Sequence, residues 1–269
     1  MKWQGRRGSD NVEDRRGMST GTKVVGGGLG TLVIVLLVYL LGGDPSGILQ
    51  QSGSSGTAGP VEASEEENAM AQFVSVVLAD TEEVWGKIFA QSGATYRQPT
   101  LVLFRDQVQS ACGYATAASG PFYCPGDEKV YIDLSFFDDL RAKYGVYGDF
   151  AIAYVVAHEI GHHVQNQMGI LDEVQTERQR LSEVRGNQLT VRLELQADFL
   201  AGVWAHHASN MFNSIEEGDI EEALNAAASI GDDVLQKKYQ GRVVPDSFTH
   251  GTAAQRSSWL RKGWETGDL

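Results

Sequence analysis

The pattern of apolar and polar residues divides the 269-residue chain into regions of different character. Residues 24–41, VVGGGLGTLVIVLLVYLL, form an uncharged apolar run of about the length that crosses a bilayer as a helix. Residues 42–64 are rich in Gly, Ser and Pro and lack periodic apolar positions, which is typical of a flexible linker. Apolar periodicity then continues to the end of the chain. We therefore expect one folded domain over residues 65–269.

The predicted domain begins with helical periodicity. Ser64 can cap a helix whose first turn is acidic and whose apolar positions recur at helical spacing through Phe89. A break is expected near Asp80 and Thr81, which would divide this region into two helices.

Short strand-like segments follow this helical region and precede a longer one. Each is β-branched or aromatic and bounded by turn residues, and they cover residues 100–104, 112–116 and 129–134. From Ser135 helical patterns dominate, and the last helix begins near Thr252. This order predicts an α+β domain, with a small sheet followed by a helical region.

The charge pattern predicts where the two ends of the chain lie relative to a membrane. The formal net charge is −13, which argues against nucleic acid as a partner. Residues 1–23 hold six basic and three acidic side chains, so we expect a cytoplasmic N-terminus, a single crossing by residues 24–41 and an outward-facing domain. The flank after Leu41 is a poor cleavage site, which favours an uncleaved anchor over a signal peptide.

The chain contains two cysteines, Cys112 and Cys124. If the domain faces an oxidising compartment, a disulfide that closes this short loop is the natural expectation. Their spacing matches no zinc knuckle, and two inert buried thiols are the remaining alternative.

The stretch AHEIGHHVQN carries the candidate chemistry. On a helix, His158 and His162 project from one face a turn apart, so both imidazoles can reach one ion. Glu159 lies one step around the helix, where it can act on a metal-bound water without ligating the metal. His163 is rotated away from this face, and we expect it to be a packing or surface residue.

A catalytic zinc ion needs a third protein ligand and an open position. The segment LELQADFLAGVWA offers Glu194 and Asp198 on one helical face among apolar neighbours. Buried acids need partners, and zinc for Glu194 and a ligand histidine N–H for Asp198 would supply them. The alternative is that both acids pair with Arg185 or Arg192 on a solvated face.

HEIGH followed by ELQAD resembles the glutamate-zincin pattern, and the chain resembles the bacterial neutral zinc metallopeptidase family, a group of membrane-anchored proteins. The similarity extends to GRRGSDNVEDRRG, SACGYA, GPFYCPGDEKVYIDLSFF and SFTHGTAAQR. It implies a zincin-like domain that holds Zn²⁺ on His158, His162 and Glu194, with Glu159 as general base. The implied substrate is a peptide or protein.

Several further roles are expected on weaker grounds. His250, in a turn before the last helix, is the candidate donor to the oxyanion, with Tyr154 and Tyr239 behind it. Arg256 suits a substrate contact and a structural role equally well. The strand KVYIDL, residues 129–134, is a candidate edge for pairing with an extended peptide, and an interior position is the alternative.

Two other functions fit the same residues. One is a non-catalytic zinc protein that binds envelope partners, although a structural site would not require Glu159. The other is a zinc amidase that acts on cell-wall peptides.

Overall fold

The computed structural model describes residues 1–17 and 63–269. Residues 1–15 and 64–269 form one compact unit. The predicted membrane span, residues 24–41, and nearly all of the predicted linker lie outside the described residues. Within the described ranges, no helix has both the length and the apolar character needed to cross a membrane.

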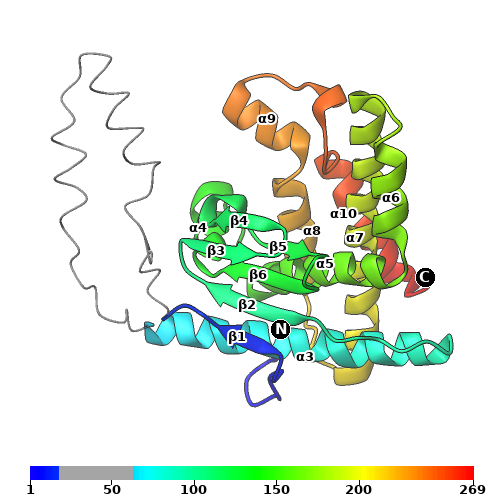
Figure 1. The fold of residues 1–269 in the computed structure, drawn as a ribbon. Helices are drawn as coiled ribbons and strands as arrows, with labels where there is room; N and C mark the ends of the chain where they lie inside the picture. Colours follow the sequence, from blue (N-terminus) through cyan, green and yellow to red (C-terminus); the bar gives the residue numbers. More distant parts are fainter. Residues whose placement is uncertain (18–62) are drawn as a thin grey trace, which may run out of the picture. The chain divides into compact units, whose positions relative to one another are not determined.

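The folded unit is an α+β domain, as the order of sequence patterns predicts (Figure 1). Its strands are β1 Val12–Asp14, β2 Thr100–Phe104, β3 Gln107–Ser110, β4 Gly113–Thr116, β5 Phe122–Cys124 and β6 Lys129–Asp133. Its helices are α3 Glu65–Gln91, α4 Ser135–Tyr144, α5 Asp149–Gln167, α6 Ile170–Arg178, α7 Glu183–Phe212, α8 Asp219–Ser229, α9 Asp232–Gln240 and α10 Ala253–Thr266. Short 3-10 turns cover Ala117–Ser119 and Pro245–Ser247.

The main sheet has four strands in the order β1-β2-β6-β5. Strands β1, β2 and β6 run parallel, and β5 pairs with β6 in the antiparallel direction. Strand β6 therefore lies between two partners. The expectation that KVYIDL forms a free edge is wrong, because both of its sides are hydrogen-bonded. The edge strands of this sheet, among the described residues, are β1 and β5. Strands β3 and β4 form a separate antiparallel hairpin.

Helix α3 runs without interruption from Glu65 to Gln91, so the predicted break near Asp80 and Thr81 does not occur. Its start agrees with the sequence, since the Glu67 backbone N–H donates to Ser64 Oγ at 3.1 Å. Thr81 is fully buried and its hydroxyl donates to the Leu78 carbonyl at 2.7 Å within the helix. Polar residues that suggested a break are thus accommodated inside the helix by packing and local hydrogen bonds.

The N-terminal segment is part of this domain. The Leu101 N–H donates to the Asn11 carbonyl at 2.8 Å and the Arg15 N–H donates to the Leu103 carbonyl at 2.8 Å, which adds β1 to the sheet. The Asp80 carboxylate on α3 accepts two bonds of 2.6 Å from the Arg6 guanidinium. The predicted domain boundary at residue 65 is therefore corrected, because residues 1–15 belong to the same fold.

Helices α5 and α7 form the centre of the helical region. The apolar positions of α5 that were expected to anchor it are buried, and they include Ile152, Val155, Val156 and Ile160. The backbones of the two helices come close at Gly161, where an added Cβ would stand 3.0 Å from the Ala197 carbonyl oxygen. Helix α10 packs along α7 on another side, so three helices meet where the candidate ligands lie.

Candidate metal centre

Two imidazoles and a carboxylate converge between α5 and α7. Nε2 of His158 lies 3.2 Å from Glu194 Oε2, and Nε2 of His162 lies 3.5 Å from Glu194 Oε1. The candidate ligand atoms of the three residues all lie within 4.8 Å of one another. This donor set fits zinc, which takes imidazole nitrogen and carboxylate oxygen in catalytic sites.

The helical geometry explains this convergence. His158 and His162 are one turn apart on α5, and their rings lie 4.9 Å apart. Glu194 projects from α7, and the close approach at Gly161 brings the two helices near enough for one ion to reach all three side chains. A side chain at position 161 would hold the helices apart, which explains why glycine suits it.

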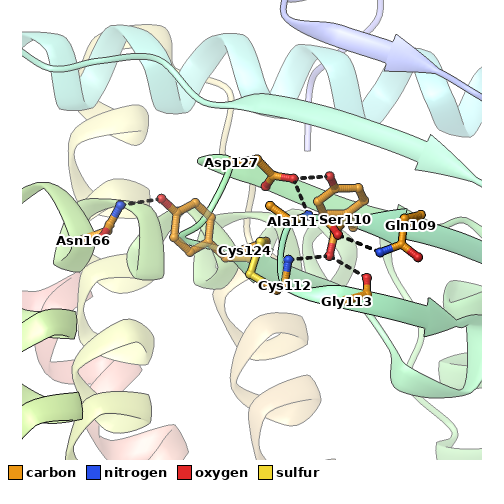
Figure 2. Close-up of a disulfide and its surroundings, with 10 residues drawn as sticks. Gln109, Ser110, Ala111, Cys112, Gly113, Cys124, Asp127 and Asn166 are labelled. Carbon is orange, nitrogen blue, oxygen red and sulfur yellow. Dashed lines mark hydrogen bonds between the residues drawn. A yellow bond between two sulfur atoms is a disulfide. The ribbon is translucent and has the colours of Figure 1, made fainter.

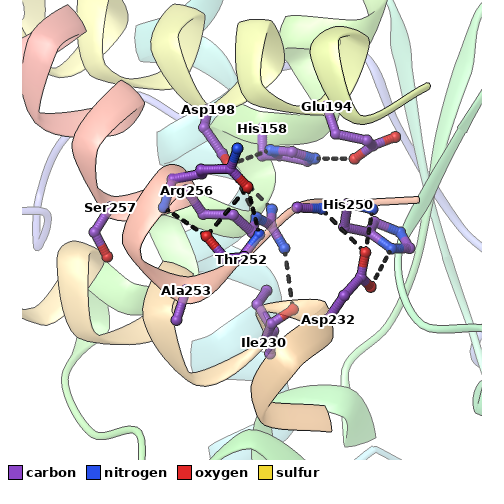
Figure 3. Close-up of polar contacts among 12 residues, drawn as sticks. His158, Glu194, Asp198, Ile230, Asp232, His250, Thr252, Ala253, Arg256 and Ser257 are labelled. Carbon is purple, nitrogen blue, oxygen red and sulfur yellow. Dashed lines mark hydrogen bonds and ion pairs between the residues drawn. The ribbon is translucent and has the colours of Figure 1, made fainter. Parts of the chain in front are cut away.

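Each histidine is oriented by a hydrogen bond at Nδ1. His158 Nδ1 donates to Asp198 Oδ1 at 2.8 Å (Figure 3), and His162 Nδ1 donates to Gln165 Oε1 at 2.8 Å. These bonds leave Nε2 of each ring facing Glu194, where its lone pair can bind a metal. The Gln165 amide is itself fixed, because it donates to the Leu193 carbonyl at 2.7 Å. Sequence reasoning identified Asp198 for this role but missed Gln165.

Asp198 is the centre of a fully buried polar network. Arg256 donates to both carboxylate oxygens, at 2.9 and 3.0 Å, and the Tyr154 hydroxyl donates to Oδ1 at 2.6 Å. Burial alone would raise the pKa of Asp198, but Arg256 and His158 outweigh it and lower the pKa to about 2. The sequence left Arg256 open between two roles and offered Tyr154 as an oxyanion donor. In the structure both are hydrogen-bond partners of Asp198, and both also line the cavity beside the candidate ligands.

The protein groups alone create a site that favours positive charge. Burial lowers the pKa of His158, but the Asp198 and Glu194 carboxylates outweigh it and raise the pKa to about 10. Burial raises the pKa of Glu194, and the two imidazoles outweigh that effect and hold it well below its ordinary value. Protons and a metal cation compete for such a site, so metal binding must release protons.

Glu159 lies beside this group without belonging to it. Its side chain is largely buried, and it lines a cavity of about 660 Å³ together with the three candidate ligands. The cavity wall is mostly aromatic and aliphatic and includes Phe122, Tyr123, Phe136, Leu171 and Leu193. A carboxylate at this position can exchange a proton with water that enters the cavity.

His250 also lines the cavity, and an aspartate holds it there. Its side chain is half exposed, and Nδ1 lies 3.3 Å from Asp232 Oδ1 (Figure 3). Asp232 Oδ2 accepts the backbone N–H groups of Thr249, His250 and Gly251 at 2.7, 2.6 and 3.0 Å. Asp232 therefore fixes the turn that carries His250, a role that sequence reasoning missed.

Tyr239 and His163 lie away from the candidate ligands. Tyr239 is exposed, its hydroxyl lies 2.9 Å from the Tyr144 hydroxyl, and it is not among the described residues that line the cavity. His163 is fully buried, so the packing role expected for it fits better than the surface role.

A second group of possible metal ligands is present among the described residues. It consists only of acids: Asp149, Asp219 and Glu222. The Met1 ammonium lies 2.9 Å from Asp149 and 3.2 Å from Asp219. The Met1 ammonium group thus already supplies positive charge to these three acids. The His158, His162 and Glu194 group instead has the mixture of nitrogen and oxygen ligands that zinc prefers.

Comparison with known proteins agrees with this site. Residues 1–269 match the family described as "Putative neutral zinc metallopeptidase". The chain belongs to this family. Its resemblance to that family is therefore confirmed, and the match covers the N-terminal segment as well as the metal-site helices.

The chain has relatives in Escherichia coli and Mycobacterium tuberculosis. The chain is 49% identical over 277 residues to "Uncharacterized protein YpfJ" of Escherichia coli strain K12, covering 100% of this chain and 96% of that protein. It is 45% identical over 183 residues to "Uncharacterized protein Rv2575" of Mycobacterium tuberculosis strain H37Rv, covering 64% of this chain and 61% of that protein. No solved structure matches the chain.

Proposed function

We propose that this protein is a zinc-dependent peptidase with a zincin-like catalytic domain, in which Zn²⁺ is held by His158, His162 and Glu194. One observation carries the proposal: three donors of the types zinc prefers meet within 4.8 Å at the wall of a cavity that Glu159 also lines. When bound, zinc supplies a Lewis acid that polarises a carbonyl and acidifies water.

The residues around the cavity divide the remaining chemistry. Glu159 takes the proton of the attacking water and passes it to the leaving amine as general acid. His250 donates a hydrogen bond to the oxyanion of the tetrahedral intermediate, and Asp232 orients its imidazole. Asp198 and Gln165 keep the two ligand imidazoles in the tautomer that presents Nε2.

The edge strand β5 is the proposed platform for substrate. Phe122 and Tyr123 line the cavity, and β5 has a pairing partner on one side only among the described strands. An extended peptide can add to such an edge through backbone hydrogen bonds, which makes recognition tolerant of sequence. A peptide-bound structure with the ligand away from β5 would overturn this assignment.

The full chain is the protein to test, because residues 1–15 belong to the domain. Wild type is expected to bind one zinc ion and to cleave members of a peptide library, with loss of cleavage in chelator. Glu159→Gln should retain zinc and lose cleavage, whereas His162→Ala should lose both. His250→Ala, which leaves the three ligands intact, should retain zinc and cleave with lower kcat.

The same experiment separates the alternatives. A Glu159→Gln protein that cleaves as fast as wild type would refute the proposed general base. Zinc binding without any cleavage would favour the non-catalytic binding protein, and cleavage restricted to purified cell-wall fragments would favour the amidase.

We propose further that the protein is attached to the bacterial cytoplasmic membrane through residues 24–41, with its domain on the oxidising side. The apolar, uncharged character of that run supports attachment, and a disulfide between Cys112 and Cys124 supports an oxidising compartment. We also propose one change to the expected topology. Residues 1–15 share the sheet with residues 64–269, which supports an arrangement in which both flanks of the run lie on the same face of the membrane, in place of a single crossing.

A labelling experiment tests this topology. Asp10 and Glu66 are exposed positions in the two flanks. Cysteines introduced separately as Asp10→Cys and Glu66→Cys should both react with a membrane-impermeant maleimide from the periplasmic or outer face of intact cytoplasmic membranes. Labelling of Glu66→Cys alone would restore the cytoplasmic N-terminus and refute the same-face arrangement.

A further inference from the structure

Strand pairing alone does little to hold the edge strand β5 beside the candidate metal site. It contains three residues, Phe122–Cys124, and pairs only with β6 among the described strands. Phe122 stacks on Tyr131 of β6, with ring centroids 4.8 Å apart and planes at 7°. These contacts tie β5 to the sheet. They do not tie it to helix α5, which carries the candidate ligands.

The connection to α5 is made by the Tyr123 hydroxyl. It lies 3.0 Å from Nδ1 of His163 and 2.9 Å from Nδ2 of Asn166, and both of these residues are on α5. The other nitrogen of His163, Nε2, lies 2.6 Å from the Arg97 carbonyl oxygen. Nε2 also lies 2.7 Å from the side-chain amide nitrogen of Gln167. We assign the proton to Nε2, which then donates to the Arg97 carbonyl, and Nδ1 accepts from the Tyr123 hydroxyl.

The Tyr123 hydroxyl has a polar partner on two residues of α5. The Tyr123 hydroxyl donates to His163 and accepts from the Asn166 amide, which Figure 2 shows beside the disulfide. His163 is fully buried, so its nitrogens have no water to replace these partners. The ring of Tyr123 meanwhile lines the cavity. One side chain thus touches both the helix of the ligands and the proposed substrate site.

The disulfide holds the far end of the same strand. Cys124, the last residue of β5, is fully buried and bonded to Cys112 in the turn between β3 and β4 (Figure 2). Strand β5 is therefore attached at Cys124 to the hairpin and at Tyr123 to α5. Its position relative to the metal helix is set by these two attachments and by its pairing with β6.

We propose that His163 and Asn166 are positioning residues for substrate: through the Tyr123 hydroxyl they hold the edge strand β5 at a fixed place beside the helix that carries His158 and His162. The assignment rests on the proposed function, because it supposes that peptides bind along β5. Neither His163 nor Asn166 belongs to the candidate ligand group. Their effect is on how substrate lies against the site.

Tyr123→Phe tests the link, because it removes one hydroxyl and keeps the ring. In the full chain it should retain the wild-type zinc content and raise KM about fivefold, the effect of one net hydrogen bond, with kcat within about twofold of wild type. In a Glu159→Gln background, the variant should bind a fluorescein-labelled form of the best-cleaved library peptide about fivefold more weakly.

Tyr96→Phe is the matched control. The ring of Tyr96 packs on the other side of His163, with centroids 5.6 Å apart, and its buried hydroxyl has no hydrogen-bond partner among the described residues. Tyr96 is not among the described residues that line the cavity. Loss of the Tyr96 hydroxyl should leave both KM and peptide affinity unchanged. This result would separate the effect of the Tyr123 hydrogen bonds from a general effect of altered packing around His163.

Asn166→Leu supplies a second route to the same link. It removes the amide that donates to Tyr123, so its effect on peptide affinity should not add to that of Tyr123→Phe in the double variant. Additive effects, or an unchanged peptide affinity in Tyr123→Phe, would overturn the assignment while leaving the peptidase function in place. If the Glu159→Gln parent binds no peptide from the library, the proposed function itself fails, and this assignment fails with it.

Discussion

The Asp198 carboxylate lies 2.8 Å from Nδ1 of His158 and also receives two hydrogen bonds from Arg256. It therefore joins the imidazole of a candidate metal ligand on α5 to a buried guanidinium on α10. The arrangement keeps Asp198 ionised inside the protein, because Arg256 supplies the charge that burial would otherwise make too costly. An ionised partner at Nδ1 also makes the opposite nitrogen of His158 a better electron donor.

Asp198→Asn should weaken zinc binding about 10- to 100-fold, since the amide keeps the shape but loses the charge that supports His158. The measurement is competition for zinc against a fluorescent chelator. Tyr154→Phe is the control, because it removes one donor to Asp198 and leaves both the carboxylate and Arg256 in place. Equal zinc affinity in wild type and Asp198→Asn would contradict the role assigned to Asp198.

The convergence of the candidate ligands could be predicted from the sequence because it depends on helical periodicity. His158 and His162 are four residues apart, as are Glu194 and Asp198, and each pair lies on one helix face wherever the helices go. Partners at a distance could not be found this way. Asp232 acts through three backbone N–H groups of a turn, and the sequence carries no pattern for that contact.

Strand pairing shows the same limit. The segment 129–134 was recognisable as a strand, but its place inside the sheet depends on two partners that the local pattern does not contain. Strands β1 and β5 have three residues each, too few for alternation to be visible. The charges of residues 1–23 predict a membrane topology, yet one of them, Arg6, pairs with Asp80 within the fold.

Gly161→Ala should destabilise the fold by about 1–3 kcal/mol, because the new methyl group would press on the Ala197 backbone where α5 and α7 meet. It should also weaken zinc binding, since the ligands come from both helices. The control is Gly86→Ala in α3, where an added Cβ meets nothing within 4 Å and helix propensity favours alanine. Urea unfolding measures the stability of both variants. Equal unfolding midpoints for Gly161→Ala and Gly86→Ala would contradict the close contact at Gly161.

Without metal, the protein should be most stable between about pH 4 and 6.5. The pKa of His158 is raised from 6.5 to about 10, so its contribution is complete below pH 6.5 and is lost as the pH rises toward 10. The pKa of Asp198 is lowered from 3.8 to about 2, so its contribution is complete above pH 3.8 and is lost as the pH falls toward 2.

Zinc should reverse the alkaline part of this profile, because it binds the deprotonated imidazoles and its affinity rises with pH. The measurement is Tm from pH 4 to 9 in chelator and in excess zinc. The increase in Tm produced by zinc should grow between pH 6 and 8. A metal-free Tm that rises from pH 6.5 to 9 would show that the His158 and Asp198 pair does not stabilise the fold in this way.

Arg6→Ala should destabilise the protein by about 1.5–3 kcal/mol, because it leaves the buried Asp80 carboxylate without its bidentate partner. Arg7→Ala is the matched control at the next position. The Arg7 side chain is 56% exposed and its guanidinium lies 3.3 Å from the half-exposed Glu83 carboxylate, so its removal should cost less than about 1 kcal/mol. Urea unfolding at pH 8 measures both.

The difference in free energy of unfolding between Arg6→Ala and Arg7→Ala should become smaller at low pH. Burial raises the pKa of Asp80 to about 6 although Arg6 lowers it, so the side chain is mostly neutral at pH 5 and ionised at pH 8. Loss of Arg6 leaves an unpaired buried charge at pH 8 but a neutral acid at pH 5. Equal stability of Arg6→Ala and Arg7→Ala at pH 8 would mean that residues 1–15 do not pack on α3, and the same-face topology would lose its support.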